Sequence, residues 1–245
     1  NPKTAVVTGA TSGIGLACVE ALLDDGHRVI ALGRRAERIE QMRAQFGEER
    51  FYGAICDVRD RASIDACIAA LPADMTTVDT LINNAGLLVG SSDFIRIEPD
   101  AVHTMLQTNI AGVLNTTQAF LPMLESSVRG HIVNITSIGA KYHYVGGNVY
   151  AATKAFVEHF GHCLRAELVG RKIRVSNIAP GRTETEFSLV RFGGDADKAK
   201  QAYQDVTPLQ AEDIARAIVW ILAQPVHVNV NSIELMPADQ SFSFR

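Results

Sequence analysis

The chain has 245 residues, a formal net charge of −4 and 47% hydrophobic residues. This length and apolar content predict a single domain over residues 1–245, and the acidic balance argues against a nucleic-acid-binding protein. No apolar run approaches the roughly 20 residues that a membrane-spanning helix needs, and the first residues lead into a strand without a secretory segment. We therefore expect a cytoplasmic protein with no nucleic-acid partner and no membrane partner.

Cysteine and histidine spacing gives no sign of a metal site. The four cysteines form no CxxC pair and fall in predicted helices or strands, which favours buried, reduced thiols. The seven histidines show neither HxxxH nor HExxH spacing, so we expect no bound metal. The cysteines are Cys18, Cys56, Cys67 and Cys163.

A glycine-rich turn follows the first predicted strand. Residues 4–8 form that strand, and the run Gly9-Ala10-Thr11-Ser12-Gly13-Ile14-Gly15 leads into an amphipathic helix to about Asp25. In this setting backbone N–H groups and the helix dipole face an anion, and absent side chains let it come close. The turn therefore predicts a phosphate site. A plain strand-to-helix turn is the alternative, because the Gly-x-x-x-Gly-x-Gly spacing differs from the commoner dinucleotide fingerprint.

Two arginines follow the second predicted strand, residues 28–32, where an acidic residue often binds an adenosine ribose. A carboxylate there would repel the 2′-phosphate of NADP, whereas a guanidinium can pair with it through two hydrogen bonds. Arg34 and Arg35 therefore predict NADP. The alternative is that they only begin the exposed helix over 36–46.

The next two strands end in residues suited to a cofactor. Asp57 and Val58 follow the strand over 51–56, where an adenine would lie, and a helix over 60–71 comes next. Asn83-Asn84-Ala85-Gly86 follows the strand over 78–82. Small and amide-bearing residues allow a ligand to pass close to the backbone.

Asn109 lies near the middle of a long helix predicted from about 99 to 125, among apolar residues. A buried amide must find hydrogen-bond partners. Asn109 is therefore either a satisfied core residue or the holder of a water that links Lys154 to solvent.

Ser137, Tyr150 and Lys154 are the main catalytic candidates. Ser137 follows the strand over 131–136, and the other two lie four residues apart on one face of a helix over 149–170. An adjacent ammonium favours the phenolate and brings the phenol's pKa of about 10 towards the range of an acid–base catalyst. The Ser137 hydroxyl could then bond the oxygen that Tyr150 protonates. A lone YxxxK would more often be a surface pair.

The last third of the chain adds a strand over 173–178 that ends at Pro180-Gly181, a helix over 211–223 and a strand over 228–235. Between them, residues 182–205 look less regular and contain Gly193-Gly194, which is typical of a hinged substrate lid. Residues 237–245 form a tail.

Seven strands alternate with six helices along the chain. Right-handed crossovers make this an α/β, single-domain, doubly wound (Rossmann-type) parallel sheet with helices on both faces. The chain resembles the short-chain dehydrogenase/reductase family over essentially its whole length. The motifs that carry the resemblance occur in the family's order: Thr8-Gly9-x-x-x-Gly13-x-Gly15, Asn83-Asn84-Ala85-Gly86, Asn109, Ser137, Tyr150-x-x-x-Lys154 and Pro180-Gly181.

The resemblance implies residue roles. Asn109, Ser137, Tyr150 and Lys154 would form the catalytic set, with Tyr150 exchanging a proton with the substrate oxygen and Lys154 also bonding the nicotinamide ribose. It implies a homotetramer as well, in which the helices over 99–125 and 149–170 pack between subunits through apolar residues that include Phe156, Phe160 and Leu164. Thr183 stands where the family often has valine. The implied cofactor-binding residues are Gly9, Ser12, Gly13, Ile14, Gly15, Arg34, Arg35, Asp57, Val58, Asn84, Gly86, Tyr150, Lys154, Pro180, Gly181, Thr183 and Thr185.

A narrower resemblance concerns the substrate. Residues 148–156, 185–192 and 234–237 are similar to those of NADP-dependent 3-hydroxy acid dehydrogenases, and sulfoacetaldehyde reductases belong to the same neighbourhood. Both substrate types are short anions whose reacting carbon would lie against Ser137 and Tyr150, so the pocket needs a cation. Arg182 is the first candidate, Arg191 the second and Arg245 in the tail the third, with a solvent-facing arginine the alternative for each.

The extra cation beside the pocket favours a sulfonate, because its three oxygens ask for more donors than a carboxylate. We therefore expect an NADPH-dependent reductase of a short anionic aldehyde or ketone, most concretely sulfoacetaldehyde to isethionate. The alternative is an NADP-dependent 3-hydroxy acid dehydrogenase acting on serine, allo-threonine or 3-hydroxypropionate. A catalytically silent dinucleotide sensor is the rival from another class.

Overall fold

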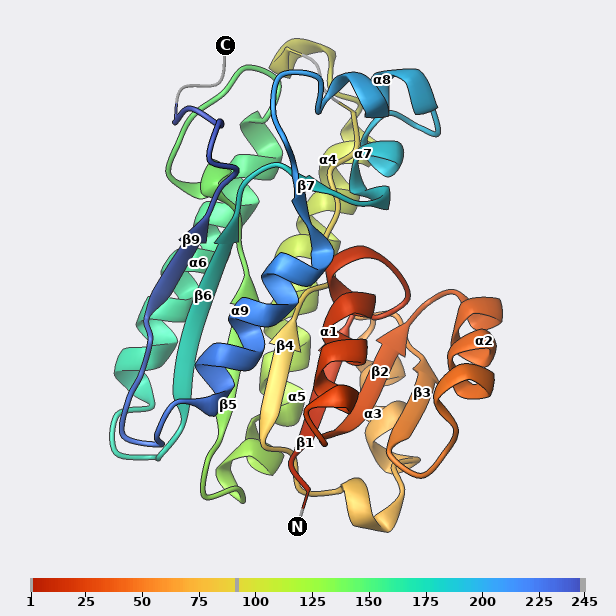
Figure 1. Ribbon diagram of the computed structural model, residues 1–245, viewed down its shortest axis with the longest axis vertical. Coiled ribbons are helices and arrows are strands. Elements are labelled where there is room, and N and C mark those ends of the chain that lie inside the picture. Colours follow the sequence, from red (N-terminus) through yellow and green to blue (C-terminus); the bar gives the residue numbers. More distant parts are fainter. Residues whose placement is uncertain (1, 91–92, 243–245) are drawn as a thin grey trace.

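The computed structural model describes residues 2–90 and 93–242 and contains the seven-stranded parallel sheet that the sequence predicts (Figure 1). The strands follow the order β3-β2-β1-β4-β5-β6-β9, and each neighbouring pair is parallel. The inner strands are buried on both faces, as parallel strands between two helical layers should be. The strands are β1 (Thr4–Thr8), β2 (Arg28–Gly33), β3 (Phe51–Ile55), β4 (Thr80–Asn83), β5 (His131–Ile135), β6 (Arg174–Pro180) and β9 (Ser232–Leu235).

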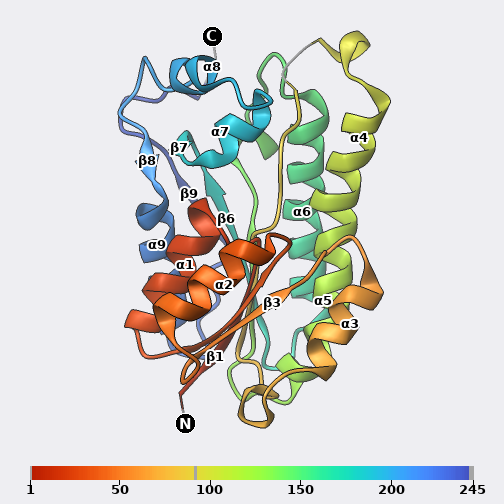
Figure 2. The ribbon, with the colours of Figure 1, turned by 90° about the vertical axis from the view of Figure 1, so that its right-hand side faces the viewer.

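Helices cover both faces of the sheet, and Figure 2 shows the two layers from the side. Helices α1, α2 and α9 cover one face, and α3, α5 and α6 cover the other. Each layer closes its own apolar core against the sheet. The helices are α1 (Gly13–Asp24), α2 (Ala36–Phe46), α3 (Arg61–Ala69), α4 (Pro99–Leu106), α5 (Gly112–Glu125), α6 (Asn148–Glu167), α7 (Glu186–Arg191), α8 (Ala196–Gln201) and α9 (Ala211–Ala223).

The strand order reverses between β1 and β4. The chain builds outwards from β1 through β2 and β3 on one side and, from β4 onwards, on the other. The connections that leave β1 and β4 therefore diverge and open a crevice at the carboxyl ends of the strands, which is where ligands bind in such sheets.

The helix predicted over 99–125 is interrupted. A π-helical turn, Gln107–Ala111, lies between α4 and α5 and contains Asn109. Such turns are rare and occur often at functional sites.

The segment 182–205 is more regular than the sequence suggests. It contains α7 and α8, and strand β7 (Thr183–Glu184) pairs in parallel with β8 (Leu209–Gln210). The hydroxyl of Tyr203 donates to the carbonyl of Thr183 at 3.0 Å and lies 2.6 Å from the hydroxyl of Ser188. These bonds tie the segment together.

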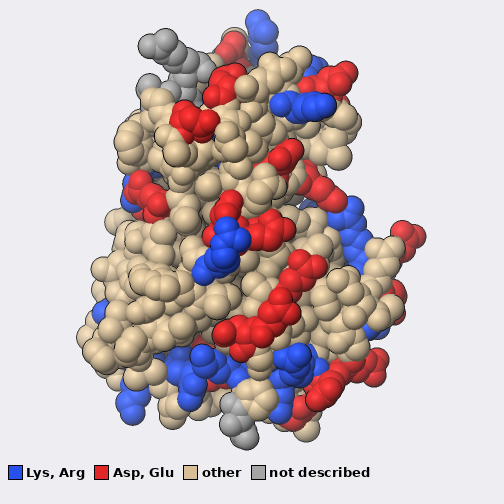
Figure 3. Space-filling model, in the orientation of Figure 1, with Lys and Arg blue, Asp and Glu red and all other residues tan. Residues whose placement is uncertain are grey.

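Acidic and basic side chains are mixed over the face drawn in Figure 3. Within residues 2–90 and 93–242, no helix is long and apolar enough to cross a membrane, and no three metal-binding side chains come together. All four cysteines are free, but Cys163 is exposed on α6, so the expectation of burial is wrong for it.

Candidate active site

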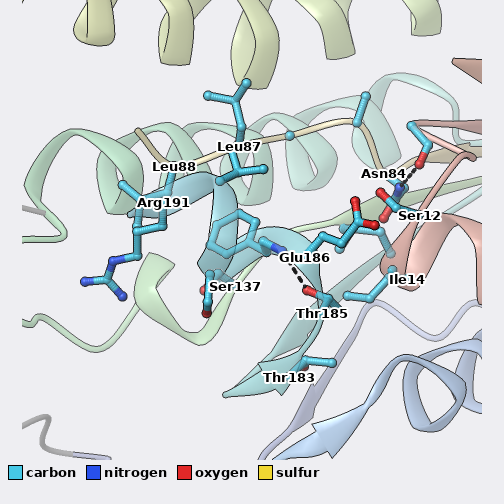
Figure 4. A pocket seen from close by; sticks show the side chains of 18 of the residues that line it. Ser12, Ile14, Asn84, Leu87, Leu88, Ser137, Thr183, Thr185, Glu186 and Arg191 are labelled. Carbon is cyan, nitrogen blue, oxygen red and sulfur yellow. Dashed lines mark hydrogen bonds between the residues drawn. The ribbon is translucent and has the colours of Figure 1, made fainter. Parts of the chain in front are cut away.

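A cavity of about 600 Å³ lies at the carboxyl ends of the strands. Figure 4 shows its two ends: Ser12, Ile14 and Asn84 lie at one, and Ser137 and Arg191 at the other. All cofactor residues expected from the sequence line it except Gly15, and so do Ser137, Arg182 and Arg191. Arg245 lies outside the residues that the structure describes.

The glycine-rich turn is shaped by close backbone approach. Gly9 and Gly13 have φ values of +62° and +51°, a region that favours glycine. A Cβ at Gly9 would lie 2.9 Å from the Cα of Ala85, and one at Gly15 would lie 2.3 Å from the carbonyl oxygen of Gly9. Gly15 therefore packs α1 against the turn and is not among the residues that line the cavity, and its assignment as a cofactor residue stays a prediction.

Thr8 fastens the turn after β1 to the loop after β4. Its hydroxyl accepts from the backbone N–H groups of Asn84 and Ala85 at 3.0 and 2.9 Å. The side-chain amide of Asn84 donates back to the carbonyl of Thr8 at 2.9 Å. Both walls at this end of the cavity are thereby held in one arrangement.

Three buried asparagines connect β4, β5 and β6 at the other end of the cavity. The amide of Asn83 donates to Asn134 at 3.0 Å, and the amide of Asn134 donates to Asn177 at 3.2 Å. They occupy one register across β4, β5 and β6. The sequence analysis did not single out Asn134 and Asn177. Each is a single amide at the same position of an otherwise apolar strand, and this pattern could have predicted that they bond each other.

The two arginines after β2 take different positions. Arg35 donates to the hydroxyl of Thr11 at 2.8 and 3.0 Å and to that of Ser12 at 2.6 Å, so it faces the glycine-rich turn. Arg34 lines the cavity near Asp57. Hydrogen bonds from Arg59 chiefly, with Arg34 adding a smaller attraction, hold the pKa of the Asp57 carboxyl below its usual range.

Tyr150 is buried, with 8% of its surface exposed, and its ring lies 5.4 Å from that of Phe187 on α7. Burial raises the pKa of the phenol and the nearby Tyr144 adds to this, while a hydrogen bond from Ser137 and the charge of Arg191 oppose it. Desolvation outweighs the favourable charges, so the pKa of this phenol is raised, whereas the sequence predicted that Lys154 would lower it.

Lys154 lies beside Tyr150, as the four-residue spacing predicts. Its Nζ is 5.9 Å from the centre of the phenol ring and donates to the carbonyl of Ile135 at 2.8 Å. Burial lowers the pKa of this amine to about 8. A Cβ at Gly86 would lie 3.2 Å from this Nζ, so the glycine leaves the amine open to the cavity.

Asn109 lies behind the cavity wall, and both its amide nitrogen and its amide oxygen have partners. Its amide donates to the carbonyl of Leu87 at 2.9 Å and to the hydroxyl of Thr153 at 3.0 Å, and its oxygen accepts from the N–H of Leu87 at 2.9 Å. This matches the alternative of a satisfied core amide. The π-helical turn thereby holds the loop that carries Gly86 against α6.

The end of the cavity near Ser137 is lined by aromatic and apolar side chains, most of which the sequence did not single out. Leu88 and Tyr150 belong to one small cluster, against which Tyr144 and Phe187 pack. Tyr144 lies against Gly147, where a Cβ would lie 2.1 Å from its ring, so the glycine is needed to accommodate it.

Arg191 and Arg182 differ in what surrounds them. Arg191 ends α7 and is close enough to Tyr150 to oppose the rise of its pKa. The guanidinium of Arg182 lies 3.7 Å from the carboxylate of Asp205. The charge of Arg191 thus acts on Tyr150, whereas Arg182 lies beside a carboxylate, and which of the two binds a substrate anion stays a prediction.

Comparisons with known proteins agree over the whole chain. The short chain dehydrogenase family matches residues 3–191. The serine 3-dehydrogenase of Agrobacterium fabrum is 44% identical over 240 residues, which cover 98% of this chain and 96% of that protein. The NADP-dependent 3-hydroxy acid dehydrogenase YdfG of Salmonella typhi is 44% identical over 239 residues, which cover 97% and 96%. A solved closed form of serine dehydrogenase complexed with NADP+ has a TM-score of 0.95 at 43% identity and covers 97% of this chain and 96% of its own.

Proposed function

Because the chain belongs to the short-chain dehydrogenase family, we propose that it is an NADP-dependent dehydrogenase of short 3-hydroxy acids. The observation that carries the proposal is one cavity in which Ser137 bonds a buried Tyr150 and Arg191 supplies a cation. The reaction would convert the C3 hydroxyl of the acid to a carbonyl, or run in reverse.

The relatives reverse the order of the two activities considered from the sequence. Those compared above are named for serine and for 3-hydroxy acids, and none of them for a sulfonate. Reduction of sulfoacetaldehyde therefore lacks support, and oxidation of a 3-hydroxy carboxylate is the better-supported activity.

The residues present fit NADP. Gly9 and Gly13 line the cavity beside the amino end of α1, where backbone N–H groups would bind a pyrophosphate, and the guanidinium groups of Arg34 and Arg35, which also line it, would bind a 2′-phosphate. Further along the cavity, Lys154 and Thr185 would hold the nicotinamide half. When bound, NADP would supply the hydride acceptor or donor and, in its oxidised form, a positive charge that favours the phenolate of Tyr150.

Tyr150 would act as the general base in oxidation. Its phenolate takes the proton of the substrate hydroxyl as the carbon gives up a hydride and the C=O bond forms, and the phenol returns that proton in reduction. Ser137 would hold the substrate oxygen through its hydroxyl. Phe187 and Leu88 would keep water away from the reacting carbon.

Arg191 would bind the substrate carboxylate. It is a lining arginine whose charge acts on Tyr150, and a short 3-hydroxy acid places its carboxylate only two bonds from the reacting carbon. Arg182, close to Asp205, would contribute less.

A substrate panel tests the proposal. Purified protein is assayed with NADP+ and each of 3-hydroxypropionate, serine, allo-threonine and isethionate, and with NADPH and sulfoacetaldehyde. We expect the highest kcat/KM for one of the carboxylates, and loss of turnover in Tyr150→Phe by about 100-fold or more. A higher kcat/KM for sulfoacetaldehyde would restore the sulfonate activity in place of this one.

Arginine variants test the carboxylate site in the same assay. Arg191→Gln should raise KM about tenfold or more, because a charge-assisted hydrogen bond is lost. Arg182→Gln should raise it less. A larger increase in KM for Arg182→Gln than for Arg191→Gln would show that Arg182 binds the substrate carboxylate.

We also propose a homotetramer in the cytoplasm. Its support is the apolar surface left exposed on α5 and α6, where Leu114 and Phe156 face outwards. Leu164, included in this interface from the sequence, is instead part of the core between α6 and the sheet.

A further inference from the structure

A carboxylate from the segment over the cavity occupies the arginines at its phosphate end. Glu186, the first residue of α7, accepts from Arg35 at 3.0 Å and from Arg38 at 2.9 Å. Figure 4 shows Glu186 on the side of the cavity where Ser12 lies, away from Arg191. These contacts join α7 to the start of α2, about 150 residues earlier in the chain.

These ion pairs are suited to exchange. The side chains of Arg35 and Glu186 are 43% and 41% exposed, and pairs that face water hold weakly. Hydrogen bonds from Arg38 and then Arg35 keep the pKa of the Glu186 carboxyl below its usual range, so it stays charged at neutral pH. A phosphate with nearly two charges and three acceptor oxygens is a stronger partner for the same guanidinium.

The same helix end also touches the catalytic tyrosine. Phe187 packs its ring 5.4 Å from that of Tyr150, and a Cβ at Gly13 would lie 3.1 Å from the side chain of Thr185. Three consecutive residues, 185 to 187, therefore contact the glycine-rich turn, the arginines and the catalytic tyrosine. Movement of Glu186 away from the arginines would therefore act directly on Phe187, the next residue, which packs on Tyr150.

We propose that Glu186 stands in for the 2′-phosphate of the cofactor at Arg35, so that the bound phosphate displaces this carboxylate and loosens the hold on α7. The inference rests on NADP as the cofactor of the proposed function. Arg35 then serves two anions in turn, the lid carboxylate in the free chain and the 2′-phosphate in the complex. A nucleotide without the 2′-phosphate leaves the Glu186 contacts in place.

Binding of nucleotide fragments tests the exchange without turnover. Dissociation constants of adenosine 2′,5′-bisphosphate and adenosine 5′-monophosphate are measured by calorimetry for the wild type and Glu186→Gln. The variant should bind the bisphosphate about three- to tenfold more tightly, because its competitor is gone, and the monophosphate with unchanged affinity. An equal gain for both nucleotides would show a general charge effect and overturn the exchange.

Glu184→Gln is the matched control. Glu184 lies two residues earlier on β7, and its carboxylate accepts from Gln210 at 3.3 Å. The Glu184→Gln substitution removes one negative charge from the same segment and leaves the contact between Glu186 and Arg35 in place. It should leave both dissociation constants unchanged, and a gain for the bisphosphate equal to that of Glu186→Gln would contradict the proposal.

Hydrogen exchange measures the release of α7 directly. In the wild type, the bisphosphate should speed amide exchange over residues 186–191 and the monophosphate should not. In Glu186→Gln, exchange there should be fast from the start and insensitive to either nucleotide. Unchanged exchange in the wild type saturated with bisphosphate would overturn the proposal.

Failure of the proposed function would look different. If the wild type binds the bisphosphate no better than the monophosphate, the NADP assignment itself fails. If it prefers the bisphosphate while Glu186→Gln behaves like the wild type, NADP stands and only the displacement of Glu186 is refuted.

Discussion

Burial controls the protonation of both candidate catalytic groups on α6. It raises the pKa of Tyr150, and it lowers the pKa of Lys154 to about 8. Each shift favours the neutral form, as expected for groups removed from water. The amine is therefore half charged at about pH 8, and a bound anion would favour its ammonium form.

The shift of Lys154 predicts a pH dependence for cofactor binding. The ammonium form predominates below pH 8 and the neutral amine above it, and a charged donor makes the stronger hydrogen bond to the ribose. The affinity for NADP should therefore be constant near pH 7 and fall about five- to tenfold as the pH rises through 8 to about 9.5. Calorimetric titrations across this range measure it.

Two variants separate Lys154 from its neighbour. Lys154→Met carries no charge and should bind weakly at every pH, whereas Tyr150→Phe should keep the wild-type profile. A wild-type affinity that stays flat over the whole range would mean that the Lys154 amine does not contact the cofactor.

Residue types and their spacing were enough to predict the candidate site residues, but they did not predict how deeply these side chains are buried. Ser137, Tyr150 and Lys154 could be named because one lies at a strand end and the others share a helix face. The sequence does not show how deeply a side chain lies, so it predicted an acidic phenol where desolvation makes it less acidic. The sequence also does not show what lies beside Arg182, since Asp205 comes from a turn further along the chain.

At the scale of elements, strong local patterns were predictive. The buried strands and α9 (Ala211–Ala223) were predicted from the pattern of apolar residues in each segment, and the structure contains them. The π-helical turn and the short pair β7 and β8 did not, because tertiary hydrogen bonds stabilise them. The interaction of α7 with α2 through Glu186 is also a tertiary contact that no local pattern indicates.

The pairing of β5 with β6 contains a buried histidine that predicts acid sensitivity. The Nε2 of His131 lies 2.8 Å from the hydroxyl of Ser176, and burial chiefly, with the charge of Arg174, lowers the pKa of the imidazole to about 3. An unfolded chain binds this proton near pH 6.5. The unfolded state therefore gains protons first, and stability is lost as the pH falls from about 6.5 towards about 3, by about 1.4 kcal/mol per unit.

Urea unfolding at a series of pH values measures this loss. His131→Gln should lose less stability than the wild type between about pH 6.5 and pH 4.5, while His227→Gln, at an exposed histidine, should follow the wild type. Identical slopes for the wild type and His131→Gln would show that protonation of His131 is not coupled to unfolding.

At the scale of the whole molecule, large apolar side chains stay exposed on two separate faces. Phe156 on α6 is 41% exposed and stacks with Phe160 at a ring distance of 6.3 Å. Trp220 on α9 is 54% exposed, and β9 is an edge strand of the sheet. An open edge and apolar patches of this kind are usually covered by another chain.

Two faces, each paired with its own copy through a twofold axis, produce a closed tetramer. In sedimentation velocity experiments the wild type should therefore behave as four chains of 26.5 kDa each. Phe156→Glu should break one face and Trp220→Glu the other, because an unpaired charge is too costly to bury within an interface. Each variant should leave dimers that are held together by the unchanged face. The double variant should be monomeric with an unchanged circular dichroism spectrum.

A wild type that sediments as a single chain at micromolar concentration would refute the tetramer, and dimers that persist in the double variant would place the interfaces elsewhere.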